Sequence, residues 1–246
     1  MPVPTEDKFL HIANDFWQKW QFPNCIGCID GKHIRIKKPK KSGSMYYNYK
    51  GFFSIILLAI TDANYKFIMV DIGAYGKDND AGVFDTGLFR RAIECGKIKV
   101  PAKDFLPSSN IKAPFVLLGD SAFPLKTYLL KPFPDANTVP GDDKDRFNYR
   151  LSRARMVVEC SFGSIASKFG ILSRPIATDV DNAIHIVKAT TIIHNTACDL
   201  EAPSNQTSYS TTFQRQQSLR RSRRYNASTR EALQTRDLFL NFFKHN

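Results

Sequence analysis

The order of apolar runs along the chain is the feature that most restricts its fold. Three runs with strand character follow one another with short connections, at about residues 26–36, 52–61 and 67–72. Strands joined in this way pair antiparallel. A helical pattern at about 81–95 then precedes a short apolar run at 115–118, which can pair parallel beside the first strand. The order therefore predicts an α/β fold with a mixed sheet of three antiparallel strands and then a parallel strand, flanked by helices.

Further helices are expected before and after the strands. The spacing of apolar residues predicts a helix over 6–20, a short helix after 121–125, and two long helices over about 152–168 and 181–200. The last of these is apolar around much of its circumference, which is typical of a buried helix. Residues 97–112 and 131–146, rich in Pro, Lys and Asp, are expected to be loops.

The C-terminal part differs in composition. From about Glu201 it is rich in Ser, Thr, Gln and Asn, as in a linker, and the tail that follows is basic, with an arginine cluster at 220–224. Residues 232–243 have the pattern of a short amphipathic helix.

The chain carries a formal net charge of +12 over 246 residues, of which 43% are hydrophobic. That apolar content is enough for a core. The charge favours a polyanionic partner, with a basic but otherwise ordinary enzyme as the alternative. The longest apolar run, about residues 52–60, is interrupted by Ser54 and predicts a buried strand rather than a membrane span.

Five cysteines are scattered along the chain, and no apolar signal-peptide segment precedes them. This pattern predicts a reduced, intracellular compartment. Cys25 and Cys28 have the spacing of half a zinc site, but no second pair follows at a suitable distance. Two strand cysteines without a metal are therefore favoured.

Three acidic residues stand in unusual positions. Asp30 lies within a strand-like run, Asp120 follows the apolar run at 115–118, and Glu159 lies inside a helical segment. A buried carboxylate beside another is unfavourable, and a divalent cation removes that cost, since Mg²⁺ takes oxygen ligands. The alternative is that both aspartates are strand-end or turn residues and that Glu159 pairs with Arg155 four residues earlier. The residues alone leave both interpretations open.

Several motifs resemble those of the Harbinger-type DDE transposases and the nucleases derived from them. The resemblance covers about residues 20–200 in the family's order, through residues 22–34, 47–51 (Tyr-Asn-Tyr-Lys-Gly), 73–80, 118–123 (Leu-Gly-Asp-Ser-Ala-Phe), 147–150, 155–171 and 193–195. It implies a ribonuclease-H-like fold, with Asp30, Asp120 and Glu159 as catalytic acids. Asp80 matches a further acid that often serves as a metal ligand.

The resemblance also implies a reaction. Members cleave DNA phosphodiesters with two Mg²⁺ or Mn²⁺ ions, one activating water and the other stabilising the leaving 3′ oxygen. The alternative is a domesticated, non-cleaving DNA-binding or scaffold protein that keeps the fold. A third reading is a structure-specific nuclease of DNA or RNA without a role in transposition.

Organisation and partners follow from the same resemblance. It divides the chain into a remnant of an N-terminal helical region (1–21), a DDE endonuclease domain (22–200), and a linker with a basic tail (201–246). It implies DNA as substrate, a separate Myb-like DNA-binding protein as a partner, a homo-oligomer, and a location in the nucleus, with the cytoplasm as second choice. No membrane association is expected.

Other residues carry weaker predictions. The residues expected to contact nucleic acid are Lys50, Tyr47, Arg155, Lys37 and Lys38. For the lysines, a solvated hairpin or turn position is an equally good explanation. His33, His194 and Asn195 are expected to be structural.

Overall fold

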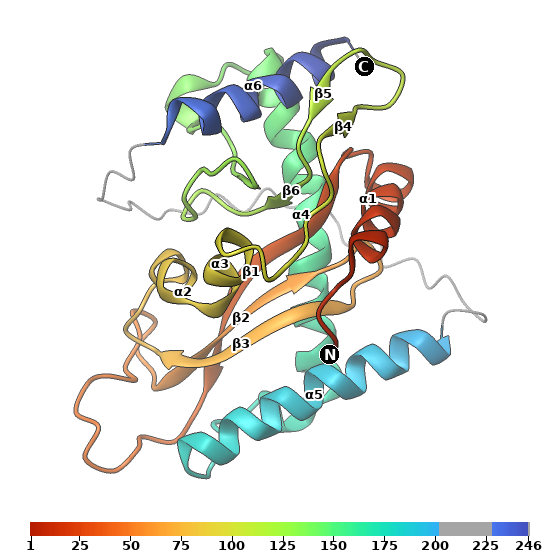
Figure 1. The fold of residues 1–246 in the computed structure, drawn as a ribbon. Helices are drawn as coiled ribbons and strands as arrows, with labels where there is room; N and C mark the ends of the chain where they lie inside the picture. The colour runs from red at the N-terminus through yellow and green to blue at the C-terminus, as the bar shows by residue number, and fades with distance from the viewer. Residues whose placement is uncertain (202–227, 246) are drawn as a thin grey trace.

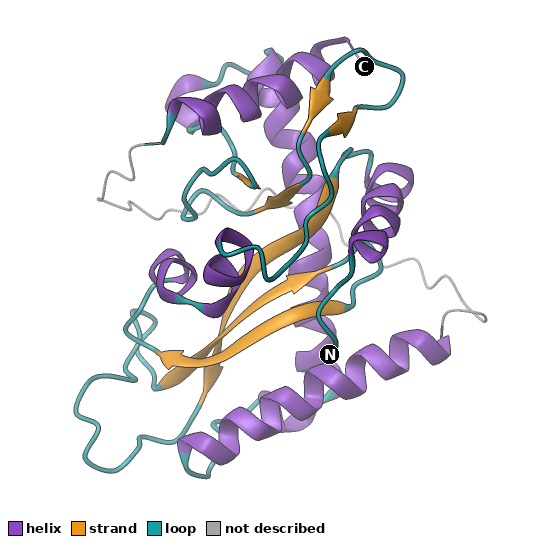
Figure 2. Cartoon of the chain, viewed as in Figure 1, coloured by secondary structure: helices purple, strands orange, loops and turns teal. Residues whose placement is uncertain are grey.

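A five-stranded mixed sheet forms the centre of the protein in the computed structural model, which describes residues 1–201 and 228–245 (Figures 1 and 2). The strand order is β3-β2-β1-β6-β7. The first three strands pair antiparallel, whereas β6 and β7 run parallel to β1, which confirms the predicted mixed sheet. The strands of this sheet are β1 (Cys25–Arg35), β2 (Ser54–Thr61), β3 (Phe67–Tyr75), β6 (Val116–Leu118) and β7 (Leu129–Leu130).

Helices cover both faces of the sheet. Figure 1 shows α4 running behind the strands and α1, α2 and α3 in front of them. The ring of Phe67 on β3 contacts both Phe162 of α4 and His194 of α5, which places α5 on the same face as α4. The helices are α1 (Glu6–Trp20), α2 (Asp80–Thr86), α3 (Leu88–Glu94), α4 (Asp143–Lys168), α5 (Val180–Glu201) and α6 (Arg230–His245), with short 3₁₀ turns at Asp135–Asn137 and Gly170–Leu172.

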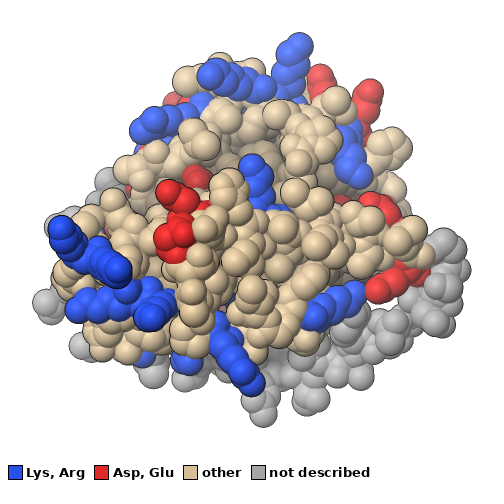
Figure 3. Space-filling view, turned by 90° about the horizontal axis from the view of Figure 1, so that it is seen from below, with Lys and Arg blue, Asp and Glu red and all other residues tan. Residues whose placement is uncertain are grey.

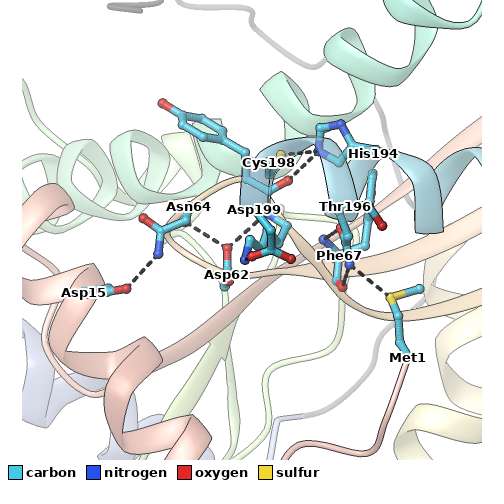
Figure 4. Close-up of polar contacts among 12 residues, drawn as sticks. Met1, Asp15, Asp62, Asn64, Phe67, His194, Thr196, Cys198 and Asp199 are labelled. Carbon is cyan, nitrogen blue, oxygen red and sulfur yellow. Dashed lines mark hydrogen bonds and ion pairs between the residues drawn. The ribbon is translucent and has the colours of Figure 1, made fainter. Parts of the chain in front are cut away.

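The β2–β3 turn is fastened to α5 by side-chain hydrogen bonds (Figure 4). His194 Nε2 lies 2.9 Å from the carbonyl oxygen of Tyr65. The Asn195 amide accepts the N–H of Phe67 at 2.8 Å and donates to its carbonyl at 2.7 Å, as a neighbouring strand would. Both side chains hold helix and strand together, so the structural interpretation of His194 and Asn195 is confirmed.

The helix predicted over 81–95 is instead two short helices, α2 and α3, separated at Gly87. A Cβ atom at position 87 would lie 2.5 Å from the carbonyl oxygen of Val83. The backbone of Gly87 is extended, so the helical hydrogen bonds are interrupted there. The apolar spacing continues across this glycine, which is why the pattern alone suggested one helix.

The short helix predicted after residues 121–125 is absent, and a strand takes its place. Leu129 and Leu130 are fully buried and form β7. Backbone hydrogen bonds join this segment to β6. The N–H of Leu117 donates to the carbonyl oxygen of Tyr128, and the N–H of Gly119 donates to that of Leu130. Burial between sheet and helices outweighs local preference here.

Two long helices differ from their predicted form. α4 begins at Asp143 rather than near 152, because Asp142 accepts the N–H of Asp145 at 2.6 Å and caps the helix. α5 is buried along one face only, and Ile192 and Ile193 are 43% and 53% exposed. The expectation of a buried helix was therefore wrong, because α5 packs on β3 along one side and leaves these two apolar side chains exposed. Within the loop predicted at 97–112, β4 (Asp104–Phe105) and β5 (Lys112–Ala113) form a small antiparallel pair.

The C-terminal helix α6 contains the amphipathic segment predicted at 232–243. Its Phe239 and Phe243 rings lie 5.7 and 5.2 Å from the ring of Phe22. The linker and the arginine cluster at 220–224 lie outside the described residues, and the division into domains stays a prediction. None of the helices in residues 1–201 and 228–245 is long and apolar enough to cross a membrane.

Candidate functional site

The parallel pairing of β1 and β6 brings Asp30 and Asp120 together. Leu118, the last residue of β6, pairs with Cys28. Two residues further along each chain stand Asp120 and Asp30, so the register places them at equivalent positions. β6 ends here whereas β1 continues to Arg35, which leaves the edge of β1 open beside both carboxylates. The expected proximity of the two acids follows from this geometry.

Asp80 approaches the same edge from the first turn of α2. Asn79 caps this helix, its side-chain oxygen accepting the N–H of Gly82 at 2.7 Å. The Asp80 carboxylate lies over Gly31, where a Cβ atom would stand 2.2 Å from Oδ1. A glycine directly after Asp30 is therefore what allows the second aspartate to come so close.

α4 adds an acid and a cation. Arg155 Nη2 lies 3.8 Å from Asp30 Oδ2 and 3.7 Å from Glu159 Oε1. The Arg155 side chain is only 12% exposed, and its buried Nε atom has no hydrogen-bond partner among the described residues. Glu159 is 57% exposed. The pair of Glu159 and Arg155, which was the alternative explanation for Glu159, is therefore present. The same arginine also contacts Asp30.

Burial and neighbouring charges shift the pKa values of two of the acids. Burial raises the pKa of Asp30 to about 6, with further increases from Asp120 and Glu159 and an opposing effect of Arg155. Burial also raises the pKa of Asp80 to about 7, and the Asp30 and Asp120 charges raise it further. Asp30 and Asp80 thus both interact with the charge of Asp120, and Glu159 acts on Asp30, so these carboxylates lie near one another.

The donor atoms of the four acids suit a divalent cation, but their arrangement is not that of a complete metal site. In the described part of the chain no group of three or more His, Cys, Asp or Glu side chains is arranged so that it could hold a metal ion. The donors present are nevertheless carboxylate oxygens, which hard cations prefer. A dication beside them would offset both the burial and the repulsion that raise the pKa of Asp30 and Asp80. That Asp30, Asp80, Asp120 and Glu159 act as metal ligands stays a prediction from the family resemblance.

Four of the residues expected to contact nucleic acid lie on the loop between β1 and β2. Lys37, Lys38, Tyr47 and Lys50 are all exposed. Lys and Arg side chains gather on the left of the face seen in Figure 3, the side on which Figure 1 draws this loop. Lys50 is near enough to Asp80 to lower its pKa. Arg155 instead points to the carboxylates, and its role toward DNA stays a prediction.

Two lysines beside the carboxylates were not anticipated. Burial lowers the pKa of Lys32, with Lys50 lowering it further and Asp30 raising it. Burial likewise lowers the pKa of Lys131, with Arg236 lowering it further and Asp120 raising it. Lys32 could have been found from the two-residue period that puts it on the same strand face as Asp30. Lys131 follows β7, whose pairing the sequence pattern did not reveal.

The five cysteines form no disulfides and differ in burial. All five are free thiols, and Cys25 and Cys28 are buried. Cys28 Sγ lies 3.3 Å from the carbonyl oxygen of Ala154 on α4. These two residues are part of the packing between β1 and its neighbours.

Comparison with known proteins defines the class. The model of the DDE superfamily endonuclease family matches residues 29–195, and the chain belongs to this family. The chain is 27% identical over 198 residues to "Protein ALP1-like" of Arabidopsis thaliana, covering 79% of this chain and 48% of that protein. It is 26% identical over 187 residues to "Putative nuclease HARBI1" of Bos taurus (75% and 49%), and 25% identical over 196 residues to its Homo sapiens counterpart (78% and 51%).

These matches confirm the resemblance to Harbinger-derived proteins, and the mixed sheet flanked by helices agrees with a ribonuclease-H-like fold. No solved structure matches the chain. The chain spans about half the length of the curated relatives that it matches.

Proposed function

We propose that the protein is a metal-dependent DNA endonuclease of the transposase type. The observation that carries this proposal is the meeting of Asp30, Asp120, Asp80 and Glu159 at the open edge of β1, two of them with pKa values raised to about 6 and about 7. The same acids that the family resemblance implies as catalytic thus lie in one cluster. Mg²⁺ or Mn²⁺ held by these four residues would supply an activated water and neutralise charge on the leaving oxygen.

The side chains around the acids have distinct roles in this proposal. Arg155 balances the charges of Asp30 and Glu159 in the absence of a cation, at 3.8 and 3.7 Å. Lys32 and Lys131 provide positive charge beside Asp30 and Asp120, where a DNA phosphate would bind. Beyond β6 the edge of β1 pairs with no other strand among the described residues, and we propose that the DNA backbone approaches the acids along this edge.

DNA is the partner that the surface favours. The formal net charge is +12, and the exposed residues Lys37, Lys38, Tyr47 and Lys50 lie on a loop next to the site. We propose that these residues position the phosphate backbone of the DNA. Their lysines would neutralise several phosphates without recognising the base sequence. A Myb-like partner that supplies sequence recognition, a homo-oligomer and a nuclear location complete the proposal, and they concern the full-length protein.

The experiment is a nicking assay on supercoiled plasmid and on DNA carrying transposon ends, with Mg²⁺ or Mn²⁺ and with EDTA as control. The wild-type protein is expected to cleave only with metal. Asp30→Asn and Glu159→Gln are expected to abolish cleavage while circular dichroism shows an intact fold. Unchanged cleavage by either folded variant removes that residue from the mechanism.

A second candidate is a DNA-binding or scaffold protein that does not cleave. The observation that favours it is the Arg155 guanidinium between Asp30 and Glu159, together with the lack of a ready group of metal ligands among the described residues. It predicts DNA binding that is unchanged by Mg²⁺ and no cleavage of any substrate. Measuring both properties on one preparation separates the two functions.

A further inference from the structure

The loop between β1 and β2, residues 36–53, combines basic and aromatic side chains in close succession. The basic residues are Lys37, Lys38, Lys40, Lys41 and Lys50, and the aromatic ones are Tyr46, Tyr47, Tyr49, Phe52 and Phe53. Lys38 lies over the Phe53 ring at 5.6 Å, and Tyr47 packs against the same ring at 5.1 Å. Basic side chains interleaved with aromatic rings are typical of surfaces that bind single-stranded nucleic acid.

The tip of this loop is held in one conformation by Asn48. Its side chain is buried, and Nδ2 donates to Ser54 Oγ at 2.9 Å. Its Oδ1 accepts the backbone N–H groups of Lys50 at 2.9 Å and Phe52 at 3.3 Å. The two residues at the tip, Tyr49 and Lys50, are therefore presented by an ordered turn, so a ligand that binds them does not have to order the loop first.

The side chain of Tyr49 is largely exposed, although its ring contacts two neighbouring side chains. Its ring meets the ring of His33 edge to face at 5.6 Å, and Lys50 lies over it at 5.6 Å, yet the residue remains 62% exposed. His33 in turn lies 3.0 Å from Ser54 Oγ through Nδ1, so the support beneath Tyr49 is itself fixed. A supported ring with most of its surface in water offers a stacking face to a ligand.

The ring also lies near the carboxylates. His33 follows Gly31 by two residues on β1, which is about 7 Å along a strand and puts both on the same face, and the Asp80 carboxylate lies over Gly31. Lys50, next to Tyr49, acts on the charge of Asp80. A DNA strand with a phosphate at the acids would therefore pass the Tyr49 ring within about three nucleotides.

The chemistry of the ring selects between forms of DNA. In a closed duplex each base is covered on both faces by its neighbours, and a protein reaches only base edges and the backbone. An unpaired base exposes its face and can stack on an aromatic side chain whatever its sequence. The exposed ring of Tyr49 can therefore stack on an unpaired base but not on a base within a closed duplex.

We infer that Tyr49 stacks on an unpaired base beside the phosphate that the acids cleave, so that the preferred substrate is DNA with an unpaired nucleotide within about three positions of the cleavage site. This inference rests on the proposed function and specifies its substrate.

The test uses the full chain in EDTA, so that binding is measured without cleavage. Two oligonucleotide duplexes of one sequence are compared, one fully paired and one with a single 2-aminopurine nucleotide in a one-base bulge. Fluorescence anisotropy gives affinity, and 2-aminopurine quenching reports stacking. The variants are Tyr49→Leu, Tyr49→Phe, which keeps the ring, and Tyr149→Leu, which removes a 51% exposed tyrosine on α4 as a matched control.

The wild-type protein is expected to bind the bulged duplex about tenfold or more tightly than the paired one and to quench the 2-aminopurine. Tyr49→Phe and Tyr149→Leu keep both effects, and Tyr49→Leu loses both. An unchanged preference in folded Tyr49→Leu overturns the inference. Absence of quenching in the wild-type protein also overturns it, whether or not Tyr49→Leu folds.

The nicking assay with Mg²⁺ on the same preparation keeps the two proposals separate. Cleavage without a preference for unpaired DNA contradicts the Tyr49 inference alone. A Tyr49-dependent preference without cleavage contradicts the nuclease function and supports the non-cleaving DNA-binding protein.

Discussion

Asp62 in the β2–β3 turn and Asp30 at the open edge of β1 are both aspartates removed from water, and burial raises the pKa of each. Their surroundings differ. Asp62 Oδ1 accepts the N–H groups of Asn64 and Lys66 at 2.8 and 3.0 Å, and the Asn64 amide donates onward to Asp15 at 2.7 Å (Figure 4). Asp30 accepts one backbone N–H, from Gly31, and lies among other carboxylates.

The comparison separates two uses of a buried acid. Around Asp62 the turn itself supplies hydrogen-bond donors, which offset part of the cost of burying the carboxylate. Around Asp30 and Asp80 the protein adds further negative charge, which makes the apoprotein less stable than it would be with neutral side chains. Such an arrangement is understandable when a cation from outside completes it.

The largest expected effect is on cleavage. Asp120→Asn should lower metal-dependent nicking by about 10³-fold or more, because it removes a charged donor from the cluster. Asp62→Asn should leave nicking within about tenfold of wild type, measured below the melting temperature of each variant. Wild-type cleavage by Asp120→Asn would remove the distinction between the two aspartates.

The next effect is on folding. Asp62→Ala should lower the free energy of unfolding by about 2–4 kcal/mol, because two backbone N–H groups lose their acceptor in a buried turn. Asp62→Asn should lower the free energy of unfolding by less, since the amide oxygen can still accept the two N–H groups. Urea denaturation followed by circular dichroism measures both, and an Asp62→Ala variant as stable as wild type would show that the turn does not depend on this carboxylate.

The pH dependence of stability tests the other side of the comparison. The pKa of Asp80 is about 7 in the folded protein against an ordinary value near 3.8. Between these values the folded state binds a proton that the unfolded state has lost, so stability falls as pH rises from about 4 to about 7. In EDTA, Asp80→Asn should lack this loss and be more stable than wild type at pH 8 by on the order of 2 kcal/mol. Urea denaturation at pH 5 and pH 8 checks this, and equal slopes with pH in both proteins would contradict it.

The smallest expected effect is stabilisation by metal. Mg²⁺ at ten times its dissociation constant should stabilise the folded protein by about 1.4 kcal/mol, which raises the melting temperature by about 3–5 °C. Asp30→Asn should abolish this increase and Asp62→Asn should retain it. Differential scanning fluorimetry at increasing Mg²⁺ gives the result, and an equal shift in all three proteins would place the cation elsewhere.

Much of the fold could be predicted because its signals are local. The 6–20 helix, the first three strands and the long helices follow from the period of their apolar residues. Two elements were wrong for different reasons. The apolar spacing continues across Gly87, where the backbone is extended and divides α2 from α3. Leu129–Leu130 form a strand because β6 offers a partner, which the pattern within that segment does not show.

The candidate site shows the same division. The proximity of Asp30 and Asp120 could be expected, since parallel strands joined through a helix end at the same edge. The close approach of Asp80 over Gly31 could not, because it depends on how α2 packs on the sheet. The helical pair of Arg155 and Glu159 could be foreseen from its spacing, but the contact of Arg155 with Asp30 and the approach of Lys131 to Asp120 could not.

By itself the sequence determined in which order the strands and helices come, and its family resemblance named the candidate acids. Periodicity encodes the elements within a few residues of each position. Only the tertiary structure decided that Asp30, Asp80 and Asp120 interact electrostatically and that Glu159 acts on Asp30, whereas Asp62 accepts hydrogen bonds from its own turn. The physical reason is that burial and charge interaction depend on distances across the fold, which chain separation does not specify.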